Sequence, residues 1–299
     1  MPHRATSLPS TTPVLQMLTE GRLDEALKAA TDLLAETRSQ AAEGDERDAR
    51  ICQALTLLGD VQRELQQVAE AEASYREGLQ LAGERPDFLG ERARLRMQLA
   101  TLLDFNQREA EAAPIYEEAA SDFEALTPPD DVTAAQLRNN LAMIYKGLGK
   151  FALAEQHYLR SLETIELRMG RDSEAVASVY NNLGSLYYTA GFAEEALKMF
   201  KEGLSIREKI LGENHPDIAQ SLSNIATARH ELGDNMSALL DFERALRILE
   251  ANLAEKAESY ETVGGDYIAL LQALDQDRRA EAFQKRMQKV LAQASSPQN

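Results

Sequence analysis

The sequence has no tryptophan, only 6% aromatic residues and a single cysteine, Cys52, among its 299 residues. One thiol cannot form an internal disulfide, and a zinc site usually needs several closely spaced cysteine or histidine ligands. The four histidines are scattered and form no metal-binding motif, and no glycine-rich phosphate-binding loop occurs. The sequence therefore predicts a non-enzyme with no metal and no cofactor, and Cys52 is expected to be a small core residue.

Basic residues are also few, because 32 lysines and arginines stand against 49 aspartates and glutamates, and the net charge is -17. Such an acidic molecule repels the phosphates of nucleic acids and anionic membranes, so neither is an expected partner. No stretch approaches the roughly 20 apolar residues of a membrane-spanning helix, and the first residues lack the apolar core of a signal peptide. We expect a cytoplasmic protein that binds another protein.

Alternating runs of valine, isoleucine and threonine, which predict strands, are missing as well. Alanine, leucine, glutamate, arginine and glutamine dominate, and these residues lose little rotamer freedom in a helix. The composition predicts an all-α fold.

An internal repeat with a period of 42 residues organises the chain. A shift of the segment 178–219 by 42 residues in either direction superimposes equivalent residues: Asn182 on Asn140 and Asn224, Gly191 on Gly149 and Gly233, Ala196 on Ala154 and Ala238. Apolar residues on both sides of Gly191 have helical spacing, and glycine readily adopts the positive φ of a tight turn. Each unit is therefore a predicted helix hairpin. Stacked hairpins bury the apolar faces that one hairpin leaves open, which predicts a right-handed α-solenoid of about six to seven units.

The repeat resembles the tetratricopeptide repeat, whose usual period is 34 residues, with eight more residues that we place at the end of the second helix and in the link. The segment 181–184 (NNLG) with Tyr187, and the link 211–217 (LGENHPD), resemble the repeat of kinesin light chains. The resemblance covers residues 135–250 closely and 14–291 loosely. We expect no heptad coiled coil, and hence no kinesin motor binding, because the repeats begin near residue 14.

A short, acidic, free-standing protein of this kind is similar to the kinesin-light-chain-like proteins that accompany tubulins in certain bacteria. The resemblance therefore implies a tubulin-like cytoskeletal partner. The repeat register and the polar composition of the ends predict four regions, with disordered ends at 1–12 and 293–299, a repeat superhelix at 13–250 and a degenerate terminal repeat with a capping helix at 251–292. His215, which precedes Pro216 in the link, is expected to form a turn.

In this family the first helix of each hairpin lines a concave groove that holds extended peptides. An asparagine amide suits that task because it both donates to and accepts from a peptide backbone. The matching positions are Asn139, Asn140, Met143 and Lys146 in one unit, Asn181, Asn182, Ser185 and Tyr188 in the next, and Gln220, Asn224, Thr227 and His230 in the third. Arg94, Thr101 and Asp104 extend this row toward the N-terminus. The asparagines have an equally good structural interpretation, in which they fix the stacking of neighbouring units.

The last helix offers a second surface, on which Arg278, Lys285 and Lys289 share a face opposite the apolar residues. In so acidic a chain, this cluster could meet an acidic partner surface. The alternative is a solvated face whose cations complement the helix dipole.

Two functions are compatible with these features. The first is a protein-interaction scaffold that binds a peptide or a filament-forming protein in the groove. The second is a regulatory sensor whose repeats change pitch on binding a small molecule or a signalling peptide, since each unit of a solenoid contacts only its neighbours.

Overall fold

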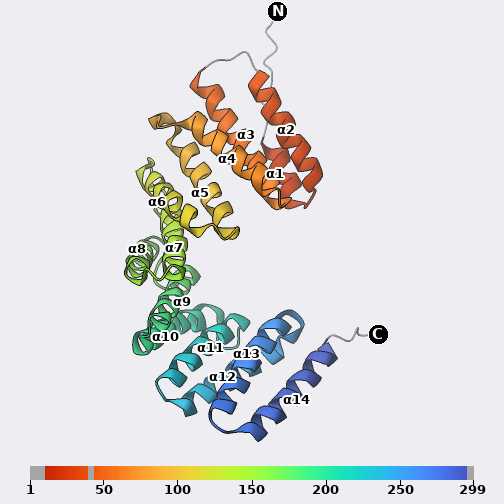
Figure 1. Ribbon diagram of the computed structural model, residues 1–299, viewed down its shortest axis with the longest axis vertical. Coiled ribbons are helices and arrows are strands. Elements are labelled where there is room, and N and C mark those ends of the chain that lie inside the picture. The colour runs from red at the N-terminus through yellow and green to blue at the C-terminus, as the bar shows by residue number, and fades with distance from the viewer. Residues whose placement is uncertain (1–10, 40–43, 295–299) are drawn as a thin grey trace, which may run out of the picture. The chain divides into compact units, whose positions relative to one another are not determined.

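The computed structural model describes residues 11–39 and 44–294, and within these residues every regular element is a helix. The α-helices are α1 Thr12–Thr19, α2 Leu23–Ser39, α3 Asp45–Glu64, α4 Val68–Ala82, α5 Leu89–Phe105, α6 Glu109–Ala125, α7 Asp131–Gly147, α8 Phe151–Met169, α9 Glu174–Thr189, α10 Ala193–Leu211, α11 Pro216–Glu231, α12 Asn235–Ala251, α13 Leu253–Ala273 and α14 Asp277–Ala294. A short 3-10 helix, η1, spans Pro86–Phe88. In chain order they make seven consecutive helix pairs (Figure 1), so the predicted all-α solenoid of helix hairpins is confirmed.

The chain divides into two compact units, an N-terminal unit up to Tyr145 and a C-terminal unit from Lys146. The division falls near the end of α7, and each unit is described by itself. The first and last expected regions lie mostly outside the described residues, although α1 begins at Thr12 and α14 extends to Ala294. None of the described helices has the length and apolar composition of a membrane span.

The seven hairpin turns share one backbone conformation. At the predicted turn position Gly191, φ is +84°, and every other pair has a residue with positive φ at the equivalent place. These residues are Gly21, Gln66, Gln107, Gly149, Gly233 and Asp275. From Gln107 onward they recur every 42 residues, so the repeat period is also the period of the turns.

The two helices of a hairpin approach closely where a small residue of the first helix meets an aromatic ring of the second. A Cβ atom added to Gly184 would lie 2.5 Å from the ring of Phe200, and one added to Gly59 would lie 2.4 Å from that of Tyr75. Ala196, the small residue that the repeat register places on the second helix, is fully buried.

The link between α10 and α11 is a capped turn, as predicted. His215 is the N-cap of α11, and its Nδ1 accepts a hydrogen bond of 3.2 Å from the backbone N–H of Asp217. The second helices α8 and α10 have 19 residues each, against 16 for the first helices α9 and α11. In these two hairpins the second helix is thus the longer one, in line with the predicted place of the extra residues at its end.

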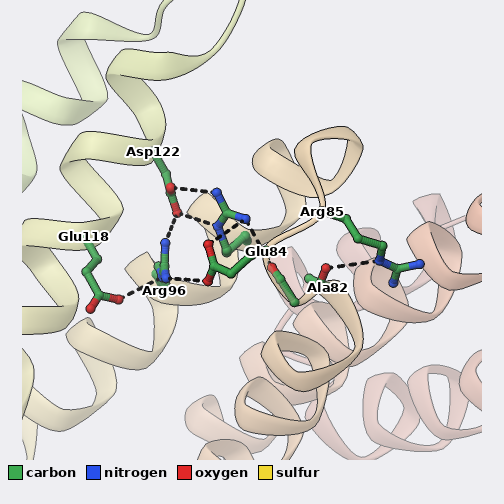
Figure 2. A network of polar contacts seen from close by, with 8 residues as sticks. Ala82, Glu84, Arg85, Arg96, Glu118 and Asp122 are labelled. Atoms are coloured by element: carbon green, nitrogen blue, oxygen red, sulfur yellow. Dashed lines mark hydrogen bonds and ion pairs between the residues drawn. The ribbon is translucent and has the colours of Figure 1, made fainter.

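A buried ion-pair network joins the helices of the third hairpin (Figure 2). The guanidinium of Arg92 on α5 donates two hydrogen bonds, of 3.1 and 3.2 Å, to the carboxylate of Asp122 on α6. Arg96 donates to the same carboxylate at 2.5 Å and to Glu118 at 3.1 Å. Glu84, which follows α4, completes the network at 3.4 Å from both arginines. Arg92 and Asp122 are each only 10% exposed, so this charge cluster is part of the interior of the N-terminal unit.

Cys52 lies on α3 and is fully buried, which confirms its predicted core position. Burial raises the pKa of its thiol to about 11, so it is protonated at neutral pH. Among the residues that the structure describes, no group of three or more His, Cys, Asp or Glu side chains could hold a metal ion.

Candidate binding face

The first helices of successive hairpins contact one another within each unit, as α3 does with α5, α9 with α11, and α11 with α13. They therefore form one layer within each unit, and the predicted binding residues lie on these helices. We call the residues up to 145 the N-terminal face (Arg94, Thr101, Asp104, Asn139, Asn140 and Met143) and those from 146 the C-terminal face (Lys146, Asn181, Asn182, Ser185, Tyr188, Gln220, Asn224, Thr227 and His230). None of these residues is buried, so all of them have surface within reach of a partner.

The asparagines of the C-terminal face hold neighbouring hairpins together. Asn224 on α11 donates a hydrogen bond of 2.7 Å to the amide oxygen of Asn181 on α9, and Gln220 donates to Asn224 at 3.1 Å. The structural interpretation therefore applies to Asn181 and Asn224, whose side chains bond to each other between neighbouring hairpins. Both amides stay half-exposed, so a partner could still meet their outer sides.

Lys146 is the half-buried cation of the C-terminal face. Its Nζ donates a hydrogen bond of 2.9 Å to the hydroxyl of Ser185, and no carboxylate of the described residues lies within ion-pair distance. Burial lowers the pKa of Lys146, because the charged form loses hydration that no opposite charge replaces. An ammonium in this state has unused capacity to bind an acidic group.

Tyr188, Thr227 and His230 continue this face. Tyr188 is 36% exposed, and its ring offers apolar area with a polar edge, a combination that is common where proteins bind each other. The ring Nδ1 of His230 lies 2.7 Å from the side-chain oxygen of Asn235, across the hairpin turn. This side of the C-terminal unit thus combines a cation, an aromatic ring and amides.

The N-terminal face contains a pocket of about 330 Å³ that only partly matches the sequence prediction. It is lined by Thr11, Leu15, Gln53, Thr56, Leu57, Glu91 and Arg94, from α1, α3, α5 and the residue before α1. Only Arg94 was predicted. The repeat register could also have predicted Gln53 as a pocket residue. Gln53 precedes Arg94 by 41 residues, which is the offset between these two hairpins, so the two residues occupy equivalent positions.

The other polar residues of the N-terminal face make contacts within the fold. The hydroxyl of Tyr116 lies 3.3 Å from Thr101 Oγ1 and 3.4 Å from the carboxylate of Asp104, and the side chain of Asn140 also hydrogen-bonds it. Burial raises the pKa of Tyr116 to about 12 and also raises the pKa of Asp104. Met143 is half-exposed, so it is the residue of α7 on this face with the most free apolar surface.

On α14, the three predicted cations Arg278, Lys285 and Lys289 are exposed and form no ion pair with residues 11–39 or 44–294. Two other arginines of the helix pair with glutamates of α12, Arg279 with Glu243 at 3.2 Å and Arg286 with Glu250 at 2.8 Å. The apolar stripe packs on the C-terminal core through Phe283, Met287, Val290 and Leu291. Of the basic residues on α14, the three predicted ones are therefore those that no described carboxylate neutralises.

Comparison with known proteins identifies the repeat. Models of the tetratricopeptide repeat match residues 133–209, 175–251 and 53–85. No curated protein sequence matches the chain. Among solved structures, BtubC (BKLC) from P. vanneervenii is similar, with 33% identity and a TM-score of 0.65 over 77% of this chain and 91% of that one.

Two more distant structures share the fold. A kinesin light chain repeat protein from Podosopora anserina has 20% identity and a TM-score of 0.57, over 70% of this chain and 99% of its own. The C-terminal part of a repeat-containing protein from Cytophaga hutchinsonii has 13% identity and a TM-score of 0.63, over 96% of this chain and 100% of its own. Both likenesses extend to the fold alone.

Proposed function

The chain belongs to the tetratricopeptide repeat family, in its kinesin-light-chain-like group, and from this premise we propose a non-catalytic scaffold that binds a partner protein along the first helices. The observation that carries the proposal is the C-terminal face, where Lys146, Tyr188 and His230 recur at 42-residue intervals on three successive first helices. An extended segment of a partner could cross all three positions, because Lys146 hydrogen-bonds Ser185 of α9, and α9 contacts α11.

We propose a tubulin-like filament protein as the partner. The support is the similarity to BtubC (BKLC), together with the resemblance of the repeat to kinesin-light-chain-like proteins that accompany bacterial tubulins. A filament presents many identical copies of one surface segment, which suits a scaffold that carries its contacts on a repeated face.

The test is co-sedimentation of the purified full chain with filaments assembled from purified bacterial tubulin. We expect the chain to pellet with the filaments, and a Lys146→Glu, Tyr188→Ala, His230→Ala variant to lose about tenfold or more in affinity, as the loss of central anchor residues does at interfaces. The matched control replaces exposed residues of the second helices, with Lys198→Glu, Lys201→Ala and Leu240→Ala, and should bind like the native chain. Equal binding by both variants would rule out the C-terminal face, and no binding by the native chain would rule out the tubulin partner.

The unpaired cations of α14 are a second contact that we propose for an acidic segment of the partner. Complementary charge raises association rates, and the effect falls with salt. Reversal of Arg278, Lys285 and Lys289 to glutamate should therefore slow association at low salt more than at high salt. A variant with Lys198 and Lys201 reversed is the control, and equal effects of the two variants would show that α14 is only a solvated face.

The pocket of the N-terminal face favours one alternative function, a sensor of a small molecule or signalling peptide. Its volume of about 330 Å³ lies within the range of small-molecule sites, roughly 300–1,000 Å³. Small-angle scattering of the purified chain with and without extracted cell metabolites separates the two functions. A change of dimensions without any protein present would favour the sensor.

A further inference from the structure

A second pocket of the N-terminal unit, of about 410 Å³, is lined by residues of the second helices α4 and α6 and of the first helix α5. Its apolar lining consists of Leu79, Leu99 and Ile115. None of the residues that line it belongs to the N-terminal face, so it is separate from the surface that we propose for a partner protein. Its volume lies within the range of small-molecule sites, roughly 300–1,000 Å³.

The polar lining of this pocket includes the two arginines of the buried ion-pair network, Arg92 and Arg96 (Figure 2). Their side chains are only 10% and 16% exposed. Of the carboxylates that they contact in the described part of the chain, only Asp122 is buried. A guanidinium does not lose its proton in a protein. The interior therefore holds two positive charges against one negative charge, and one cation depends on a counter-charge at the surface.

That counter-charge comes from exposed glutamates. Glu84 is 81% exposed and lies 3.4 Å from both arginines, further than the roughly 2.7–2.9 Å of a good charge-assisted hydrogen bond. Glu118 is 57% exposed and contacts Arg96 alone, at 3.1 Å. Exposed carboxylates gain little from such pairs, because water screens the charge and the side chain loses freedom. Glu84 is thus a weakly held counter-ion that a ligand can replace.

We propose that this pocket binds a small organic acid, a monocarboxylate with a short apolar body. Its carboxylate takes the place of Glu84 on Arg92 and Arg96, because the planar guanidinium matches the two oxygens of a carboxylate. The apolar body covers Leu79 and Ile115 and leaves water. A monoanion matches the single surplus charge of the interior, whereas the net charge of -17 disfavours ligands with more negative charge.

The experiment follows binding of hexanoate to the full chain by NMR, through the methyl signals of Leu79 and Ile115. A ligand of this size should bind with a Kd of about 1 mM. Acetate has the charged group without the body, and hexanol has the body without the charge. Each should bind about tenfold more weakly or worse, because it lacks one part of the contacts. Hexyl phosphate, a dianion at slightly alkaline pH, should also bind more weakly than hexanoate.

Glu84→Gln is the most specific test, because the exposed side chain can be replaced without disturbance of the core. It removes the carboxylate that competes with the ligand, so the affinity for hexanoate should rise about two- to fivefold. The matched control is Glu70→Gln, which removes an equal charge from an exposed site in the first turn of α4, outside the pocket. It should leave the affinity unchanged.

Two further variants should weaken binding. Arg96→Met removes the surplus charge and should lower the affinity about tenfold or more, while Arg94→Met, at an exposed site of α5 outside this pocket, should not. Urea unfolding shows whether Arg96→Met keeps the fold. Ile115→Glu leaves every ion pair of the network in place and puts a tethered carboxylate into the half-buried lining. It should abolish binding, and it decides the matter if Arg96→Met does not fold.

Binding of hexanoate that Glu84→Gln strengthens and Ile115→Glu abolishes supports the organic-acid site. No binding at about ten times the expected Kd overturns it. Tighter binding of hexyl phosphate than of hexanoate, or equal effects of Glu84→Gln and Glu70→Gln, also overturns it. Each of these failures leaves the filament co-sedimentation result intact, so the proposed function is judged separately.

Discussion

The two units use different chemistry at the same position of the repeat. In the N-terminal unit, Arg92 and Asp122 form a buried ion pair between the helices of one hairpin. The residues 126 positions later are Ile218 and Ile248, which lie buried in one apolar cluster of the C-terminal unit. The comparison shows that this position of the repeat can hold either a buried ion pair or buried apolar side chains.

The strongest way to break this comparison is to remove one charge. Asp122→Ala leaves Arg92 buried without its carboxylate and takes a partner from Arg96, so we expect a loss of about 3–5 kcal/mol in unfolding free energy. Urea unfolding combined with hydrogen exchange of α5 and α6 measures the loss. A change of only a few tenths of a kcal/mol would mean that water reaches the site and screens the charge.

Replacement of the whole pair by its apolar equivalent sharpens the comparison. In the Arg92→Ile, Asp122→Ile variant, no buried charge is left unpaired at either position, and Arg96 keeps Glu118 and Glu84. We expect a stability equal to that of the native chain or higher by about 1–4 kcal/mol, as when other buried ion pairs are replaced by apolar residues. The measurement is the same, with Asp122→Ala as the reference. A double variant as unstable as the single one would show that the N-terminal hairpin cannot accommodate the apolar pair.

The hairpin turns provide a smaller contrast, because glutamine has the left-handed conformation at residue 107 and glycine has it at residue 191. A residue with a Cβ atom costs about 1–2 kcal/mol in the left-handed conformation. A non-glycine residue also has less conformational entropy to lose on folding, which offsets about 0.4–1 kcal/mol of that cost. Gln107→Gly should therefore stabilise the chain by about 0.5–1 kcal/mol, and Gly191→Gln should destabilise it by a similar amount. Thermal unfolding of both variants tests this, and shifts of the same sign would contradict it.

The smallest expected effect is a pH dependence that comes from Asp60 of the N-terminal unit. Burial raises the pKa of Asp60 above its ordinary value of 3.8, so between 3.8 and the raised pKa the folded chain holds a proton that the unfolded chain has released. Stability then falls as pH rises through this window. The equivalent residues of the C-terminal unit are Ser185 and Thr227, which do not titrate there.

Asp60→Asn should remove this component of the pH dependence, while Asp24→Asn, at an exposed site on α2, should leave it in place. Urea midpoints between pH 3.5 and 7 provide the measurement. Identical pH profiles for the native chain and Asp60→Asn would contradict the prediction.

The sequence predicted the features that depend on the period and on local backbone preference. The 42-residue shift located the hairpins, Gly191 located a turn, and His215 was correctly assigned to the link. The turns at Gln66 and Gln107 were not predicted, because glutamine gives no local signal for positive φ. Asp122 was unrecognised, because a charged residue in an acidic helix is expected at the surface.

The candidate site depended on distances that the repeat register alone could not supply. The register placed Asn181 and Asn224 on one face, but only the structure shows that they bond to each other. The register also named Lys146. It could not reveal that the buried hydroxyl of Tyr158 has no hydrogen-bond partner among the described residues, because this depends on the atoms around it. The binding role of the first-helix residues stays a prediction.

The left-handed turn residues recur at a constant interval from Gln107 to Asp275, and this has a consequence for the gene. A recombination event between two equivalent turn codons, such as those for Gly191 and Gly233, would remove or duplicate one whole hairpin. The junction would keep the same turn conformation and the same helix phase. The length of the face can thus change in steps of one hairpin during evolution, and the number of partner residues it spans can change without the invention of a new fold.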